Sequence, residues 1–130
     1  MNGWDPAASA LLGLLPAVGR GPKRGGIFAL WLTVRVAQDL LLDPPPADRA
    51  QRRRVQALER RLSSLTMPPP LRRALGAALS QLRDARPEAA AQVLTQLVAP
   101  ARDAGGPEAG EAVALAAKQA RQAVSGAGRR

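Results

Sequence analysis

The stretch GRGPKRGGIFALWL, Gly19 to Leu32, decides the fold, because glycines and basic residues run directly into an apolar segment. From Ile27 to Leu41 the chain is apolar on nearly every side of a helix, and a helix of this kind is usually buried. We therefore expect a glycine-rich loop at residues 19–26 and a buried helix at about 26–42. The few polar residues of this helix include Arg35, Gln38 and Asp39.

One interpretation of the stretch is a phosphate-binding loop. Glycine N–H groups at a helix N-terminus bind anions, and Lys23 and Arg24 would add positive charge. The stretch lacks the Gly-Lys-Ser/Thr ending of a Walker A loop, and it is not a Gly-x-Gly-x-x-Gly turn after a strand. We therefore expect no nucleotide and no other cofactor.

A second interpretation is a membrane segment. The uninterrupted neutral run from Gly25 to Val34 has 10 residues, whereas a membrane-spanning helix needs about 20. A longer span would include Arg35 and Asp39, which are costly at the middle of a bilayer. We expect no transmembrane segment and a cytoplasmic protein, with an interfacial position of the first two helices as an alternative.

A third interpretation is a hinge that positions the apolar helix against a partner. A chain of 130 residues buries a smaller share of its surface than a large protein does. Either the neighbouring helices cover helix 26–42 completely, or another protein covers part of it. For the second alternative, the candidate exposed apolar residues are Phe28, Trp31, Val34 and Leu41.

The composition indicates an all-α fold. The chain has no Tyr, one Phe, two Trp and one Ile, whereas strands favour β-branched and aromatic residues. Its abundant Ala, Leu, Arg and Gln are strong helix formers. We expect a small open bundle of about five to six helices.

Proline and glycine clusters divide the chain into two regions and a tail. Residues 1–66 are expected to form an N-terminal helical interaction region, with helices at about 6–18, 26–42 and 47–65. Residues 67–124 are expected to form a C-terminal helical extension, with helices at about 70–84, 87–99 and 107–124, in which Pro100 and Gly105-Gly106 end the middle helix. Residues 125–130 are expected to be a disordered tail.

The helix expected at 47–65 carries apolar residues at heptad spacing, which is typical of a coiled-coil seam. The seam residues are Val55, Leu58, Leu62 and Leu65. This spacing does not distinguish a seam inside one chain from a seam between two copies, so a homo-oligomer is one alternative.

The same helix is strongly basic. Residues 49–73 hold eight arginines and one glutamate, so they carry most of the net charge of +9. Arg49, Arg53 and Arg60 fall within about 40° of one another, opposite the seam. Such a face is either simply solvated or contacts nucleic-acid phosphates or an acidic protein. No aromatic residue follows Trp31 to stack on bases, so nucleic-acid binding is the alternative hypothesis.

Catalysis is not indicated. The chain has neither Cys nor His, which removes thiol nucleophiles, the usual zinc ligands and the commonest general base. The carboxylate pairs Asp39 with Asp43 and Glu108 with Glu111 have helical spacings typical of solvated or capping charges. We predict a non-enzymatic protein without catalytic or metal residues that acts by contact with other proteins.

The order of short motifs resembles the gas vesicle protein G family over roughly residues 11–66. The matching residues are Leu11 to Leu15, Pro22, Arg24, Gly25, Trp31, Asp43-Pro44, Leu58, Glu59 and Leu62. The chain departs from the family's glutamate-rich second half, and residues 85–130 have no counterpart in it. The resemblance implies an accessory protein that assembles the shell of bacterial gas vesicles in the cytoplasm, by contact with shell or other accessory proteins.

Overall fold

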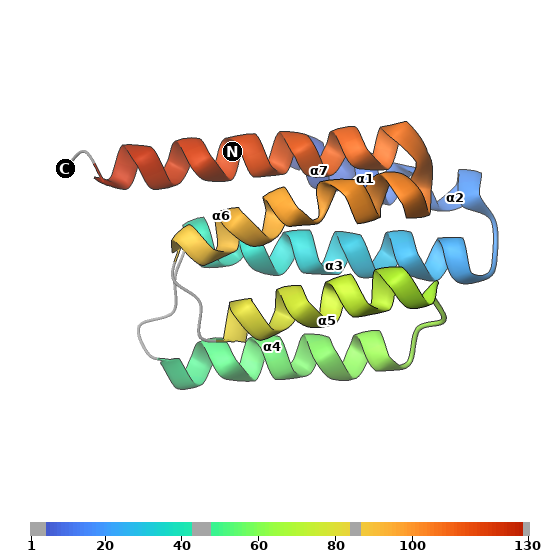
Figure 1. The fold of residues 1–130 in the computed structure, drawn as a ribbon, viewed down its shortest axis with the longest axis horizontal. Coiled ribbons are helices and arrows are strands. Elements are labelled where there is room, and N and C mark those ends of the chain that lie inside the picture. The colour runs from blue at the N-terminus through green and yellow to red at the C-terminus, as the bar shows by residue number, and fades with distance from the viewer. Residues whose placement is uncertain (1–4, 43–47, 84–86, 129–130) are drawn as a thin grey trace.

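The computed structural model describes residues 5–42, 48–83 and 87–128, and all regular secondary structure in these residues is helical. The prediction of an all-α bundle is confirmed, and the helices pack compactly rather than openly (Figure 1). In chain order the helical segments are α1 (Asp5–Gly13), α2 (Leu15–Val18), α3 (Pro22–Leu42), α4 (Asp48–Ser63), α5 (Pro69–Arg83), α6 (Pro87–Gln96) and α7 (Val98–Gly128).

Helix α3 lies at the centre of the bundle and contacts every other helix. In Figure 1 it crosses the middle of the molecule, with α6 and α7 above it and α5 and α4 below. Ile27, Leu30 and Val34 of α3 are fully buried. The expectation that this apolar helix is largely buried therefore holds for one side of α3.

Both halves of the chain contribute to the same hydrophobic core. Helix α1 packs against α7 as well as against α3. Leu11 of α1 and Val113 of α7 are fully buried in one cluster with the leucines of α3 and α5. Many of the other buried residues are alanines. Because their side chains are small, the helix axes can lie close together.

The start of α3 differs from the prediction. The helix begins at Pro22, so the expected loop at 19–26 is shorter and is made by Gly19 and Gly21, whose φ angles are 68° and 111°. Proline suits the first helical position because its φ is already helical and its missing N–H is not needed there. The rest of the stretch is the first turn of α3.

The C-terminal half departs from the prediction at one of its two expected breaks. Helix α6 ends at Gln96, and Pro100 lies in the first turn of α7 instead of ending a helix. Proline is tolerated there because a first turn has no intrahelical acceptor for its N–H. At Gly106, where φ is 84° and ψ is −175°, the backbone is not helical, so α7 consists of two helical parts that meet where the sequence predicted a break.

The predicted ends of three other helices are corrected. The helix expected at 6–18 is divided at Leu14 into α1 and α2, and α4 ends at Ser63 instead of 65. Helix α7 continues to Gly128, so the predicted disordered tail is wrong for residues 125–128. Residues 129–130 lie outside the described residues, as does residue 47, the expected start of the third helix.

Candidate protein-binding site

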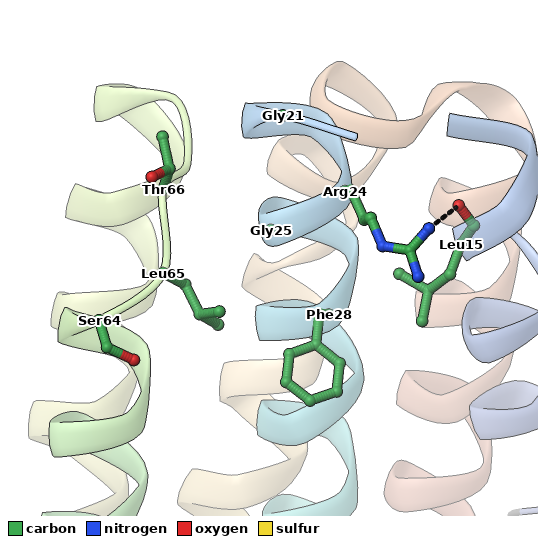
Figure 2. A pocket seen from close by; sticks show the side chains of 8 residues that line it. All are labelled: Leu15, Gly21, Arg24, Gly25, Phe28, Ser64, Leu65 and Thr66. Carbon is green, nitrogen blue, oxygen red and sulfur yellow. Dashed lines mark hydrogen bonds between the residues drawn. The ribbon is translucent and has the colours of Figure 1, made fainter. Parts of the chain in front are cut away.

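An open pocket of about 540 Å³ lies where α2, the first turns of α3 and the connection after α4 meet. Figure 2 shows this pocket between the start of α3 and the segment that leaves α4. A volume of this size lies within the range of pockets that bind ligands or partner side chains. The lining residues are Leu15, Gly21, Arg24, Gly25, Phe28, Ser64, Leu65 and Thr66.

Apolar side chains form much of the pocket wall. Leu15, Phe28 and Leu65 are partly buried. Leu15 and Leu65 also pack against the hydrophobic core. The Ser64 hydroxyl is already used locally, since its Oγ donates to the carbonyl oxygen of Arg61 at 2.7 Å. The pocket therefore offers mainly apolar surface with few side-chain hydrogen-bonding groups.

Glycine is required where α3 passes the α4–α5 connection. A Cβ atom at Gly25 would overlap with the backbone carbonyl oxygen of Thr66. A Cβ atom at Gly26 would lie 2.7 Å from Cδ2 of Leu71, which is tighter than an ordinary van der Waals contact. The glycine pair thus lets the two segments approach closely on one side of the pocket.

Arg24 places a positive charge at the edge of the pocket. Its Nη1 donates to the carbonyl oxygen of Leu15 at 3.4 Å (Figure 2), and it also donates to that of Gly19 at 3.3 Å. Both bonds are long, and the side chain is exposed. Arg24 therefore joins α2 and the residue that follows it to the start of α3, while its guanidinium stays accessible to solvent.

A stripe of partly buried apolar residues continues along α3 from the pocket. The α3 stripe consists of Phe28, Trp31, Leu32 and Val36. Residues at these spacings share one side of a helix. The rings of Phe28 and Trp31 stack with centroids 5.7 Å apart and an interplanar angle of 19°. The stripe thus presents aromatic and aliphatic surface at the boundary with solvent.

Two of the four residues predicted to be exposed lie in the stripe. Phe28 and Trp31 are partly exposed, but the prediction for Val34 is wrong, because Val34 is fully buried. It lies two positions from both Leu32 and Val36, so it points about 160° away from each of them around the helix. Leu41 is partly exposed but lies on another side of α3, near its C-terminal end.

The leucine seam is internal in this structure. Val55 is fully buried, and Leu58 and Leu62 are each 5% exposed. Helix α4 packs against α5 and α3, so these residues cover the chain's own core. Leu65 does not belong to the seam helix, because α4 ends at Ser63, and it lines the pocket instead.

The predicted basic surface is present on α4. Arg49, Arg53 and Arg60 are all exposed. Within the described part of the chain, none of these three side chains takes part in an ion pair. A bridge does join Arg83 of α5 to Glu59 of α4, with 2.8 Å between Nη2 and Oε2.

Several pocket and stripe residues were missed by sequence reasoning. Leu15, Arg24, Leu32, Ser64 and Thr66 were not predicted as contact residues. Leu32 was predictable in principle, because it follows Phe28 at i+4 and precedes Val36 at i+4. Ser64 and Thr66 were not, since they join the pocket only through the turn that brings α4 beside α3.

Two other kinds of site are not found in the part of the chain that the structure describes. Among these residues, no group of three or more His, Cys, Asp or Glu side chains is placed to hold a metal ion. In the same ranges, no helix combines the length and the hydropathy needed to cross a membrane.

No family model, curated protein or solved structure matches the chain. The resemblance to the gas vesicle protein G family therefore stays a prediction that rests on its short motifs.

Proposed function

We propose that the protein is a non-enzymatic accessory protein that acts in assembly or scaffolding by contact with another protein. Its contact site is the pocket together with the α3 stripe. The observation that carries this proposal is the pair of stacked, partly exposed aromatic rings of Phe28 and Trp31, with Phe28 lining an open apolar pocket.

The scarcity of aromatic residues adds weight to their position. The chain contains one Phe and two Trp, and two of these three side chains stack at the pocket and stripe. Aromatic residues are enriched in the parts of interfaces that contribute most binding energy. A fold stabilised elsewhere by Leu and Ala keeps the rings of Phe28 and Trp31 at the surface boundary, which favours a binding role.

The resemblance to the gas vesicle protein G family gives the first partners to test. Shell and accessory proteins of gas vesicles are the partner class that it implies, and the cytoplasm is the implied compartment. A second copy of the chain is the other partner that the test must distinguish.

The test compares complexes of the wild-type chain with those of two variants. The full chain, carrying an affinity tag, is purified from its native host, and each co-purifying protein is then produced separately and mixed with it. Light scattering at low and high salt gives the mass of each mixture and of the chain alone. We expect a complex of defined stoichiometry that Leu32→Ser, in the stripe, disrupts.

The matched control is the double variant Arg49→Glu and Arg53→Glu, on the exposed side of α4. It should keep the complex if the stripe is the contact site. The proposal would be contradicted if the chain is a monomer at both salt concentrations and forms no complex that depends on Leu32. Circular dichroism verifies that the Leu32→Ser chain keeps its helix content.

Nucleic-acid binding is a second candidate, favoured by the three exposed arginines Arg49, Arg53 and Arg60 without ion pairs in the described residues. Contacts to phosphates release counterions, so the affinity for duplex DNA would fall steeply as salt rises. Replacing the three arginines by Glu should then abolish binding. An affinity for DNA that neither salt nor this triple variant changes would exclude the candidate.

A further inference from the structure

Positive charge is concentrated at one edge of the pocket. Arg24 lines it, and Arg20 and Lys23 are exposed beside it on the same turn of chain. None of the lining residues carries a carboxylate. Along the exposed side of α3, the first carboxylate is that of Asp39, about 22 Å from Arg24 at 1.5 Å per residue.

Helix α4 also carries exposed positive charge on one of its sides. Arg54 and Arg61 are exposed and fall within about 20° of each other around α4. They lie about 140–160° from Glu59, which pairs with Arg83 of α5. Their side of α4 is therefore turned away from the ion pair that joins α4 to α5.

The charge at the start of α3 is opposite to what the helix itself favours. A helix N-terminus carries a partial positive charge and is stabilised by acidic residues in its first turn. The first turn of α3 contains no acidic residue and instead holds Lys23 and Arg24. In the free chain these charges repel the helix dipole, so an anionic partner group would relieve the repulsion.

The apolar part of the site matches the size of a helix face. From Phe28 to Val36 the stripe runs about 12 Å along α3. Amphipathic helices dock through anchors at i, i+3 or i+4, and i+7, which span about 10 Å. The pocket at one end, at about 540 Å³, is large enough for an aromatic or leucine side chain.

We infer that the pocket and the α3 stripe bind an acidic amphipathic helix of a partner protein. Its apolar face covers Phe28, Trp31 and Leu32, and its carboxylates cluster at the end that lies beside Arg20, Lys23 and Arg24. This inference rests on the proposed protein-binding function and adds the chemistry and the orientation of the partner. Charge complementarity is the observation that selects an acidic helix over a second copy, since two copies of a chain with net charge +9 repel each other.

The test uses a displayed library of helices of about 16 residues, varied at their outward positions and selected on the purified full chain. We expect selected helices to carry Asp or Glu at one end and large apolar residues at i, i+3 or i+4, and i+7. Moving the acidic residues of the best peptide to its other end should weaken binding by about tenfold.

Two double variants with equal change of charge locate the binding site. Arg20→Glu with Lys23→Glu changes exposed residues beside the pocket, and Arg49→Glu with Arg53→Glu changes exposed residues on the outer side of α4. The first should weaken the best peptide by about tenfold or more, and the second by less than about twofold. Neither pair is buried, so both proteins should fold.

Other outcomes would overturn the inference. The inference fails if the library enriches no helix, or if the selected helices carry no excess of acidic residues. It also fails if the two double variants lose binding equally. Competition by a single-stranded oligonucleotide for the Arg20 and Lys23 site would overturn it as well. If a natural complex still depends on Leu32 while the selected helices are not acidic, the proposed function stands and this inference fails.

Discussion

Gly25 illustrates how single residues shape the binding site. Glycine inside a helix normally costs stability relative to alanine, because its backbone loses more freedom on folding. At Gly25 the opposite holds, since a Cβ would overlap with the carbonyl oxygen of Thr66 in the pocket wall. The obstacle is backbone, which cannot rotate away as a flexible side chain can.

We therefore predict that Gly25→Ala lowers the free energy of unfolding by about 1–3 kcal/mol, the usual cost of overpacking. The matched control is Gly76→Ala in α5, where a Cβ meets no atom within 4 Å. That change should raise stability by about 0.5–1 kcal/mol. Urea unfolding followed by circular dichroism measures both, and a stabilised Gly25→Ala chain would show that the close approach to Thr66 is absent.

The same glycines explain one error of sequence reasoning. In sequence, GPKRGG has the composition of a loop, because glycine and proline break helices more often than they begin them. In the fold, Pro22 begins α3, and Gly25 and Gly26 allow close packing. The local sequence shows only that glycine tends to break helices. The need for glycine at positions 25 and 26 comes from Thr66 and Leu71, which are distant in the chain.

At the level of elements, α4 shows which predictions periodicity supports. The 3-4 spacing of Val55, Leu58 and Leu62 correctly predicted one apolar side, and all three are buried. Periodicity alone did not predict which helices pack against that side or at which residue α4 ends. The turn after Ser63, which removes Leu65 from the seam, forms as the chain returns to pack α5 beside α4.

We predict that Leu58→Asp with Leu62→Asp removes most of the helicity of the chain. Each leucine is only 5% exposed, and burying two unpaired carboxylates costs more than about 4 kcal/mol, a large part of a typical folding free energy. The control, Gln56→Asp with Ala57→Asp, changes exposed residues of the same helix and should keep the far-ultraviolet circular dichroism spectrum. Unchanged helicity and association state in the leucine variant would refute the internal seam.

Helix α7 shows that a proline in the sequence does not by itself mark the end of a helix. Pro100 and the pair Gly105-Gly106 were expected to end a helix, and the backbone does leave the helical conformation at Gly106, whereas Pro100 lies inside the first turn of α7. Pro100 falls in a first turn, where proline costs little, and the interruption is confined to the kink at Gly106. Whether proline ends or begins a helix depends on where the preceding helix stops, here at Gln96, and tertiary packing sets that position.

For the whole molecule, the excess of positive charge opposes folding. The net charge is +9, and much of it is carried by exposed arginines on α4 and α5. Compact chains with such charge are destabilised by self-repulsion, which salt screens over about 10 Å at 0.1 M. The composition predicted this property directly, whereas the pocket, which brings residues 15–28 together with the distant residues 64–66, was beyond reach from sequence.

We predict that raising NaCl from about 0.01 M to about 0.3 M increases the melting temperature by roughly 3–5 °C, equivalent to about 1 kcal/mol. The variant with Arg49→Glu and Arg53→Glu has its net charge lowered by four, from +9 to +5. It should show a smaller increase. A melting temperature that falls as salt rises would mean that attractive pairs outweigh the repulsion.

Site-specific photo-crosslinking can establish whether a partner protein covers the α3 stripe. A photoreactive amino acid is placed at Leu32, in the stripe, or at Gln56, on the exposed side of α4, in the full chain expressed in its native host. We predict a crosslinked product of one defined mass from position 32 and none from position 56. Crosslinking from position 56 alone, or from neither position, would contradict the assignment of the stripe as the contact site.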